Sequence, residues 1–231
     1  MNNMINKEYI YIVAKLIPKP IRKLIKKFYA PIIPQTLKVD YGERLMPEEN
    51  EAFMLSKLKE ILNNKIKGDL IEFGVYKGGS IIAFAKLLKE SNIKDKVIYG
   101  LDTFEGLPEL SEKDKIPKYY KDAMPRNYIN KVKEVLVKNN VDDIILKKGL
   151  FKDTIPNLKN KKFCFAYVDC DLYEGTKQAL EYLKPRIHKG GIIFIDDYTS
   201  SNWIGVKKAV LEVLCEKEIK EFKGQAYWTK A

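Results

Sequence analysis

The sequence contains little of the chemistry on which most metal and nucleophile sites depend. Its 231 residues include one histidine, His188, and three cysteines, Cys164, Cys170 and Cys215. One histidine excludes a histidine-rich metal site, and cysteines without metal-ligand spacing exclude a zinc cluster. The odd number of cysteines favours reduced thiols over a disulfide framework, which is typical of a cytoplasmic protein.

Long apolar runs are absent as well. No stretch approaches the roughly 20 apolar residues of a transmembrane helix, and the start, MNNMINKEYIYIVAKL, lacks the shape of a secretory signal. Hydrophobic residues make up 45% of the chain and charged residues 32%. These values predict a soluble globular protein, long enough for one large domain with a substantial core.

Arginine is scarce, although the net charge of +11 is large. Only four of the 42 basic residues are arginines, and the others are lysines spread along the chain. RNA-binding surfaces interleave arginine with aromatic residues on one patch. The charge therefore favours a solvated surface, and we expect no specific binding of nucleic acid.

Residues 1–40 form a basic, partly helical N-terminal extension, and residues 41–231 form the main domain. The extension has eight basic and two acidic residues, so it carries six of the eleven excess charges. Within residues 21–28, apolar residues follow helical spacing and lysine and arginine lie between them. Such a helix can lie on an anionic membrane surface, which would place a peripheral membrane contact in residues 11–34, at the inner membrane face. The simpler interpretation is that its apolar stripe packs on the domain or on a second subunit, because helices with one apolar stripe are the norm in folded proteins.

From residue 47 onward, helical and strand patterns alternate. Helices are predicted at 47–64, 80–91, 128–140, 175–187 and 205–218, and near-continuous apolar strands at 68–76, 96–104, 143–151, 162–171 and 190–198. Residues 105–127 are irregular, and 218–231 contain one or two final strands. This alternation predicts an α/β fold with a mostly parallel central sheet and helices on both faces.

Glycines follow the first predicted strand and an acid follows the second. Ligands of open parallel sheets bind beyond the carboxyl ends of the strands. Gly74, Gly78 and Gly79 in EFGVYKGGS allow a tight turn and a close approach to a ligand. Asp102 can accept both hydroxyls of a ribose. Together they predict a nucleoside-bearing cofactor, although each alone also fits an ordinary turn or helix cap.

Two acidic pairs follow two later strands: Asp169 and Asp171 in VDCDLYEG, and Asp196 and Asp197 in FIDDY. Four carboxylates at one edge of a sheet repel one another unless a cation lies between them. Ligands that are all oxygen select a hard divalent cation such as Mg²⁺. Such a cation can lower the pKa of a substrate hydroxyl, and a free carboxylate can accept its proton. A solvated strand end remains the simpler reading for any single aspartate.

Four segments carry a resemblance. LIEFGVYKGGS, LDTFEGLPE, KGLFKDTIP and YVDCDLYEGTKQALEYLKPRIHKGGIIFIDDY resemble, in this order, the macrocin O-methyltransferase family over residues 68–215. Members of this family use S-adenosylmethionine and magnesium to methylate sugar hydroxyls, chiefly in antibiotic biosynthesis. The resemblance implies a class I S-adenosylmethionine-dependent methyltransferase (Rossmann-like) fold. It also implies an O-methyltransferase that acts on a sugar hydroxyl of a bacterial glycan or glycosylated metabolite.

The resemblance also implies roles for single residues. Magnesium ligation is implied for Asp169, Asp196 and Asp197, and the role of general base for Asp171. Relatives of this type are often homo-oligomers. The implied contacts to S-adenosylmethionine come from Glu72, Gly74, Tyr76, Gly79, Ser80, Asp102, Phe104 and Gly149.

Two other functions fit parts of the sequence. A membrane-peripheral or RNA-binding module on a methyltransferase fold would use the charge, but it would not need four mutually repelling aspartates. A metal-dependent methyltransferase of the catechol type would share the fold and the metal. The DTFEGLP and DLYE segments point away from that second alternative.

Overall fold

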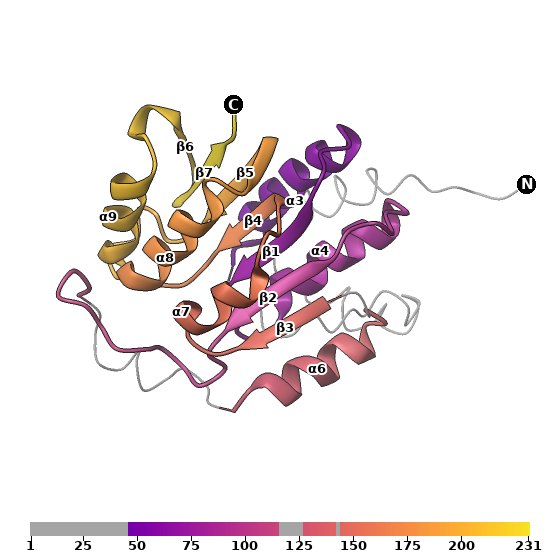
Figure 1. Ribbon diagram of the computed structural model, residues 1–231, viewed down its shortest axis with the longest axis horizontal. Coiled ribbons are helices and arrows are strands. Elements are labelled where there is room, and N and C mark those ends of the chain that lie inside the picture. The colour runs from indigo at the N-terminus through magenta and orange to yellow at the C-terminus, as the bar shows by residue number, and fades with distance from the viewer. Residues whose placement is uncertain (1–45, 116–126, 142–143) are drawn as a thin grey trace, which may run out of the picture. The chain divides into compact units, whose positions relative to one another are not determined.

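The computed structural model describes residues 46–115, 127–141 and 144–231, and Figure 1 shows their arrangement. The predicted extension 1–40, with its membrane contact in residues 11–34, lies outside the described residues and stays a prediction. None of the described helices is long and apolar enough to span a bilayer.

Seven strands form one sheet in the order β3-β2-β1-β4-β5-β7-β6. Five of them run parallel: β1 (Asp69–Phe73), β2 (Ile98–Asp102), β3 (Ile144–Lys148), β4 (Phe163–Val168) and β5 (Ile187–Ile195). The strand β7 (Gln225–Thr229) is antiparallel to β5 and to its other neighbour, β6 (Ile219–Phe222). The mostly parallel sheet is thereby confirmed, and its strand order reverses between β1 and β4, where such sheets bind ligands.

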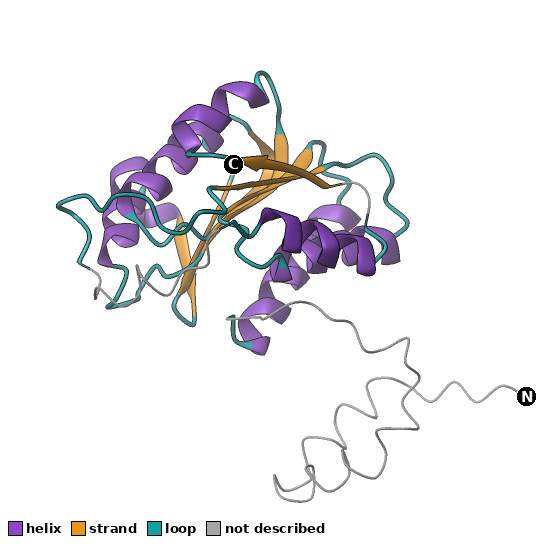
Figure 2. Cartoon of the chain, turned by 90° about the horizontal axis from the view of Figure 1, so that it is seen from below, coloured by secondary structure: helices purple, strands orange, loops and turns teal. Residues whose placement is uncertain are grey.

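Helices cover both faces of the sheet, which Figure 2 shows nearly edge-on. The core of one face includes α3 (Glu48–Asn63), α4 (Gly79–Glu90) and α6 (Ile129–Lys138). The core of the other includes α8 (Tyr173–Leu183) and α9 (Ile204–Val213). Strand β4 serves both cores, because Phe165 and Tyr167 point to the first and Ala166 and Val168 to the second.

Short helical turns form two of the connections between these elements. The chain passes from β3 to β4 through α7 (Phe151–Thr154) and the 3₁₀ turn η2 (Ile155–Leu158), and from α9 to β6 through η3 (Glu216–Glu218).

Two helix ends differ from the sequence prediction. The helix expected over 175–187 ends at Leu183, because Pro185 lacks the amide that would continue it. The helix expected over 205–218 ends at Val213. The next residue, Leu214, is extended and buries its side chain in the core, with 3% exposed. Helical periodicity continues through both segments. The missing amide of Pro185 ends the first helix, and the burial of Leu214 ends the second.

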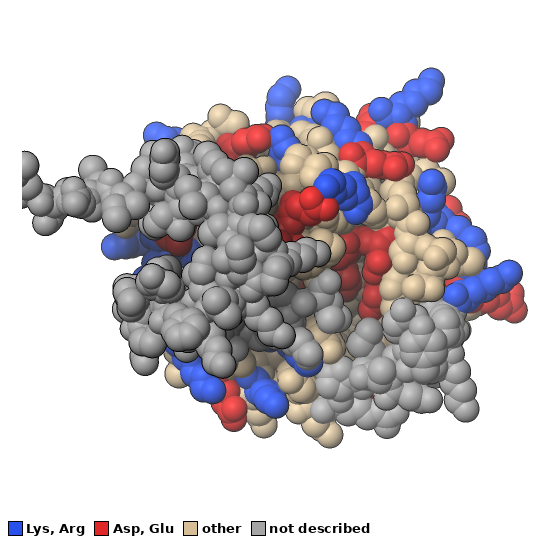
Figure 3. Space-filling model, turned by 180° about the vertical axis from the view of Figure 1, so that it is seen from behind, with Lys and Arg blue, Asp and Glu red and all other residues tan. Residues whose placement is uncertain are grey.

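Lysine is scattered over the described surface. On the face shown in Figure 3, lysine and arginine side chains lie among acidic ones and form no continuous basic patch of described residues. This distribution agrees with the expectation of a solvated surface.

Candidate active site

A cavity of about 870 Å³ lies at the carboxyl ends of the parallel strands. Its wall includes residues that follow β1, β2, β4 and β5, as expected at the reversal of strand order. Twelve residues have a role implied by the resemblance, and ten of them line this cavity: Gly74, Tyr76, Gly79, Ser80, Asp102, Phe104, Asp169, Asp171, Asp196 and Asp197. The other two, Glu72 and Gly149, lie outside the wall.

Gly74 joins the glycine turn to the acidic end of β4. Its φ of +88° is a conformation that favours glycine. A Cβ atom at this position would lie 1.8 Å from the backbone oxygen of Asp169. Its own N–H donates to the oxygen of Leu101 at 2.8 Å. The turn can therefore pack against β2 and β4 only because it has no side chain here.

Asp102 holds two turns of the cavity wall together. Its Oδ2 accepts hydrogen bonds from the backbone N–H groups of Val75 at 2.7 Å and Tyr76 at 2.9 Å. Its Oδ1 accepts one from Phe104 at 2.7 Å. The Thr103 hydroxyl lies 3.4 Å from the same Oδ1, so these donors use most of the roughly four lone-pair sites of the carboxylate. The contact with a ribose stays a prediction.

Glu72 lies beneath the cavity and has no exposed surface. One carboxylate oxygen accepts a hydrogen bond from the Ser80 hydroxyl, and the other has no partner among the described residues. Burial raises the pKa of this carboxyl well above its usual value. Gly149 instead donates its N–H to the Asp102 backbone oxygen at 2.9 Å, which ties the end of β3 to the end of β2. Both roles at the cofactor stay predictions.

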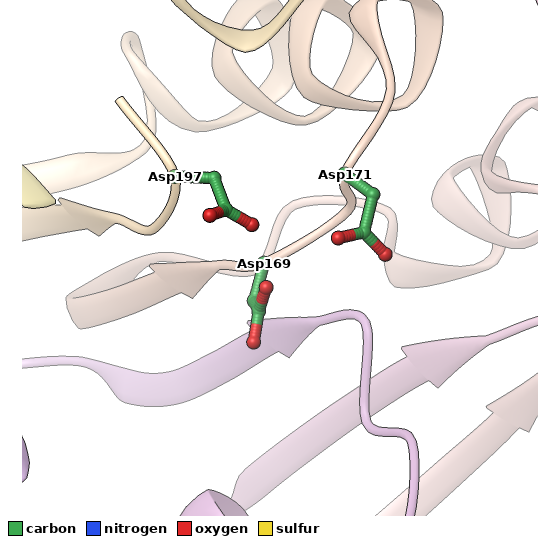
Figure 4. A group of neighbouring side chains, drawn as sticks. All are labelled: Asp169, Asp171 and Asp197. Carbon is green, nitrogen blue, oxygen red and sulfur yellow. The ribbon is translucent and has the colours of Figure 1, made fainter. Parts of the chain in front are cut away.

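Three aspartates lie together at the ends of β4 and β5, as Figure 4 shows. Asp169, Asp171 and Asp197 each offer a carboxylate oxygen, and these oxygens lie within 4.8 Å of one another. Burial, followed by repulsion from neighbouring carboxylates, raises the pKa of Asp169 and of Asp171 well above normal. Burial and the charge of Asp196 raise the pKa of Asp197 to about 7. A divalent cation would relieve this repulsion, and three carboxylates are suitable donors for Mg²⁺.

Asp196 lines the same cavity but is not a member of this closest group. Its Oδ2 accepts a hydrogen bond from the Tyr167 hydroxyl at 2.7 Å. Its Oδ1 accepts bonds from Gln225 Nε2 and from the backbone N–H of Asp197, both at 3.0 Å. These bonds orient the carboxylate, as the partners of metal ligands commonly do. The ligand role predicted for Asp196 and the base role predicted for Asp171 both stay predictions.

Tyr167 and Gln225 were not singled out in the sequence. Tyr167 is fully buried, and its hydroxyl also lies 3.3 Å from Asp169 Oδ2. Gln225 begins β7 with 1% of its surface exposed. The only signal in the sequence was a polar side chain near one end of an apolar strand. Such a pattern predicts that the side chain is buried, but it does not predict its hydrogen-bond partner.

Five residues of the wall that are not glycine have positive φ angles: Tyr76 at 48°, Phe104 at 53°, Asp171 at 62°, Asp197 at 54° and Lys223 at 46°. The first four each follow a different strand of the parallel set, and Lys223 follows β6. This conformation is costly for such residues and persists only where the surroundings hold it. Five of the ten such residues in the described part of the chain line this cavity, and residues held in this conformation often lie at functional sites.

The sequence matches the family described as Macrocin-O-methyltransferase (TylF) over residues 48–226. The chain belongs to this family. The match covers every strand of the sheet except the last residues of β7, and it confirms the resemblance carried by the glycine turn and the aspartates. In this member of the TylF family, the glycine turn and the aspartates line one cavity.

The curated relatives of this chain are O-methyltransferases by their names, and one of the names gives a rhamnosyl group in its substrate. The demethyldecarbamoylnovobiocin O-methyltransferase of Streptomyces niveus is 29% identical over 148 residues, which cover 61% of this chain and 56% of that protein. The 8-demethyl-8-(2,3-dimethoxy-alpha-L-rhamnosyl)-tetracenomycin-C 4'-O-methyltransferase of Streptomyces olivaceus is 32% identical over 148 residues, 61% of this chain and 57% of that protein. The matched part therefore spans less than three fifths of these relatives.

Solved structures confirm the fold. The calicheamicin methyltransferase CalS11 superposes with a TM-score of 0.71 at 25% identity, covering 99% of this chain and 94% of that chain. The O-methyltransferase NovP superposes with a TM-score of 0.68 at 24% identity, covering 79% of each chain. The chain has the class I methyltransferase fold predicted from the sequence.

Proposed function

We propose that this protein is an S-adenosylmethionine-dependent O-methyltransferase that methylates a hydroxyl group of a sugar-containing acceptor, with a divalent cation such as Mg²⁺ at its aspartates. The observation that carries the proposal is the position of three carboxylates within 4.8 Å of one another, in the same cavity as the glycine turn. The names of the curated relatives support the choice of a sugar hydroxyl as the acceptor.

The residues around the glycine turn fit S-adenosylmethionine. This cofactor, when bound, supplies an electrophilic methyl group. Gly74 and Gly79 leave room for close approach, Asp102 offers oxygens to a ribose, and the buried Glu72 carboxylate lies behind Ser80. The second carboxylate oxygen of Glu72 is buried without a hydrogen-bond partner in the described part of the chain, which is energetically costly. A hydrogen-bond donor on the bound cofactor that reached this oxygen would therefore stabilise the site.

The aspartates fit a hard divalent cation, because their donors are all oxygen and their mutual repulsion favours a positive charge. Such a cation, when bound, lowers the pKa of a hydroxyl and offsets the carboxylate charge. Following the family resemblance, we assign Asp169, Asp196 and Asp197 as its ligands, although the three closest carboxylates are those of Asp169, Asp171 and Asp197. Tyr167 holds Asp196 at 2.7 Å and contacts Asp169 at 3.3 Å, and it would keep both carboxylates in place.

Asp171 is the general base in this proposal. It lies in the wall between β4 and α8 and comes from the segment that follows Asp169. Burial and the charge of Asp197 raise the pKa of its carboxyl well above normal, which makes the carboxylate a better proton acceptor near neutral pH. The carboxylate would take the hydroxyl proton of the acceptor.

The test is transfer of a labelled methyl group from S-adenosylmethionine to a panel of nucleotide sugars, glycan fragments and glycosylated metabolites, with Mg²⁺ or with EDTA. We expect transfer in Mg²⁺ and about a 10²–10⁴-fold loss for Asp171→Asn, the range of general-base catalysis. Asp95→Asn, a change of an exposed aspartate, is the matched control. Full activity of Asp171→Asn would remove the base from this mechanism, and full activity in EDTA would remove the cation.

A measurement of Mn²⁺ binding, made beside the transfer assay, separates the roles of the aspartates. If Asp196 is a ligand, Asp196→Asn lowers the affinity for Mn²⁺, whereas Asp171→Asn retains binding but loses turnover. Calorimetry measures the binding without any turnover. Retained Mn²⁺ affinity in Asp196→Asn would show that Asp196 is not a ligand.

The cytoplasmic location, the membrane contact in residues 11–34 and a homo-oligomer remain proposals from the sequence. Deletion of residues 1–34 tests the membrane contact. We expect loss of binding to anionic liposomes with unchanged methyl transfer. Unchanged liposome binding would remove the contact, and loss of transfer in the soluble deletion variant would assign the extension to the site. Sedimentation of the full chain measures the oligomer.

A further inference from the structure

The chain that follows β2 forms one wall of the cavity and is then fastened to the opposite core layer. We call residues 103–115 the post-β2 segment. Its first part lines the cavity through Thr103, Phe104, Gly106, Leu107, Pro108 and Glu109. Near its start, Thr103 Oγ1 donates to the Gly106 oxygen at 2.6 Å. Its far end carries Asp114, which contacts α8 and α9.

Asp114 caps α8 from a distant part of the chain. Its Oδ1 accepts a hydrogen bond from the backbone N–H of Tyr173 at 2.8 Å, across 59 positions of sequence. Tyr173 is the first residue of α8, and Leu172 before it supplies no side-chain cap. The first amides of a helix have no partner within it, so Asp114 satisfies a donor that α8 cannot satisfy itself.

The other oxygen of Asp114 holds the post-β2 segment in shape. Asp114 Oδ2 accepts hydrogen bonds from the backbone N–H of Ser111 at 3.0 Å and from its hydroxyl at 2.7 Å. One carboxylate therefore joins the segment to the first turn of α8. An apolar residue here would break three hydrogen bonds to a half-buried carboxylate.

Gly205 shows how closely this contact is packed. A Cβ atom on Gly205 would lie 2.1 Å from Asp114 Oδ1 and 3.0 Å from the Tyr173 backbone nitrogen. Asp114 thus lies in a gap between the first turns of α8 and α9. The neighbouring Lys113 donates to Glu212 at 2.7 Å, but both side chains are more than a third exposed, and such pairs contribute little.

Asp171 lies two residues before Tyr173 and has a φ of +62°. This conformation persists only where its surroundings hold it. We propose that Asp114 is a positioning residue of the candidate active site: by fixing the first turn of α8 and the end of the post-β2 segment, it holds Asp171 and one wall of the cavity in place. The functional part of this inference rests on the proposed methyltransferase activity.

The experiment compares Asp114→Ala and Asp114→Asn with the control Asp95→Ala, below the unfolding temperature of each variant. We expect Asp114→Ala to lower kcat/KM for the acceptor about tenfold to hundredfold, as misplacement of a reacting group does. Asp114→Asn keeps an oxygen that can accept from Tyr173, so its loss is smaller. The Kd of S-adenosylhomocysteine stays within about twofold, because Asp114 contacts neither the glycine turn nor Asp102.

Hydrogen exchange tests the same inference without turnover. In Asp114→Ala, we expect faster exchange in the post-β2 segment and at the Tyr173 amide, and unchanged exchange in residues 74–80. We expect the exchange rates of Asp114→Asn to lie between those of the alanine variant and those of the wild type. This measurement remains decisive if the wild type transfers no methyl group, in which case the proposed function fails by itself.

Three results would overturn the role of Asp114. One is wild-type acceptor kinetics in Asp114→Ala. Another is an equal loss of kcat/KM in the alanine and asparagine variants, since the acceptor oxygen that asparagine offers to the Tyr173 amide would then have no effect. The third is a loss of S-adenosylhomocysteine affinity as large as the loss of acceptor kcat/KM, which would indicate general loosening of the fold.

Discussion

Burial and repulsion from Asp196 both act on the carboxyl group of Asp197, and burial is the larger cause. Burial and the charge of Asp196 raise its pKa from 3.8 to about 7 in the folded protein. Between these pH values the folded chain holds a proton that the unfolded chain has released, so the free energy of unfolding falls as pH rises. One pKa unit corresponds to about 1.4 kcal/mol, and about three units give about 4 kcal/mol at pH 8.

The perturbation is Asp197→Asn in metal-free protein. Asparagine keeps the size of the side chain and tolerates the φ of +54°, but it cannot acquire the charge. Solvent screening lowers the electrostatic free energy of about 4 kcal/mol worked out above. We therefore expect the variant to be about 2–4 kcal/mol more stable than the wild type at pH 8 in EDTA. At pH 5, the same two pKa values leave less than half of this difference, because most of the folded wild type is then protonated.

The assay is urea unfolding of the wild type, Asp197→Asn and the control Asp95→Asn at pH 5, 6.5 and 8. If the proposed cation site is right, we expect added Mg²⁺ to stabilise the wild type by binding to the folded state, and to stabilise Asp197→Asn less because a proposed ligand is lost. A variant that is less stable than the wild type at pH 8 in EDTA would refute the reasoning, and so would a difference that does not change with pH. Either result would mean that Asp197 is already compensated by partners other than a cation.

Two further substitutions test the packing and the hydrogen bonds of the site. Gly224→Ala should lower the free energy of unfolding by about 1–2 kcal/mol, the cost of a left-handed conformation, and Gly74→Ala should lower it at least twice as much. Both glycines have φ near +90°, but a Cβ meets the Asp169 oxygen at 1.8 Å at Gly74 and only Thr199 Oγ1 at 3.7 Å at Gly224; equal losses in urea unfolding would contradict the contact. Tyr167→Phe removes the donor to Asp196 and should weaken Mn²⁺ binding about 10–100-fold, with Tyr99→Phe as the control. Unchanged affinity by calorimetry would show that Tyr167 does not orient a ligand.

Much of the fold follows from local patterns. Continuous apolar runs such as FCFAYV predict buried strands, and residues with helical spacing between them predict the covering helices. The rule that ligands bind beyond the carboxyl ends of parallel strands then brings Gly74, Asp102, Asp169 and Asp197 to one edge. These inferences need only the period of the pattern and the direction of the strands, and both are properties of short segments.

Contacts between distant segments could not be predicted in this way. Leu214 ends α9 because its side chain enters the core, although the helical pattern continues. Tyr167 and Gln225 meet at Asp196 because β4 and β7 lie on either side of β5. Neither residue carries a signal of its own, since a buried tyrosine or glutamine has many acceptable partners.

The sequence by itself determined the fold class, the edge of the sheet where the site lies and the residue types that could hold a cofactor and a cation. Only the tertiary structure decided which aspartates stand closest, which partners orient them, and that Asp114 caps α8 from 59 positions away. The physical reason is range: periodicity and charge act within a segment, whereas a hydrogen bond at 2.8 Å depends on the packing of whole elements.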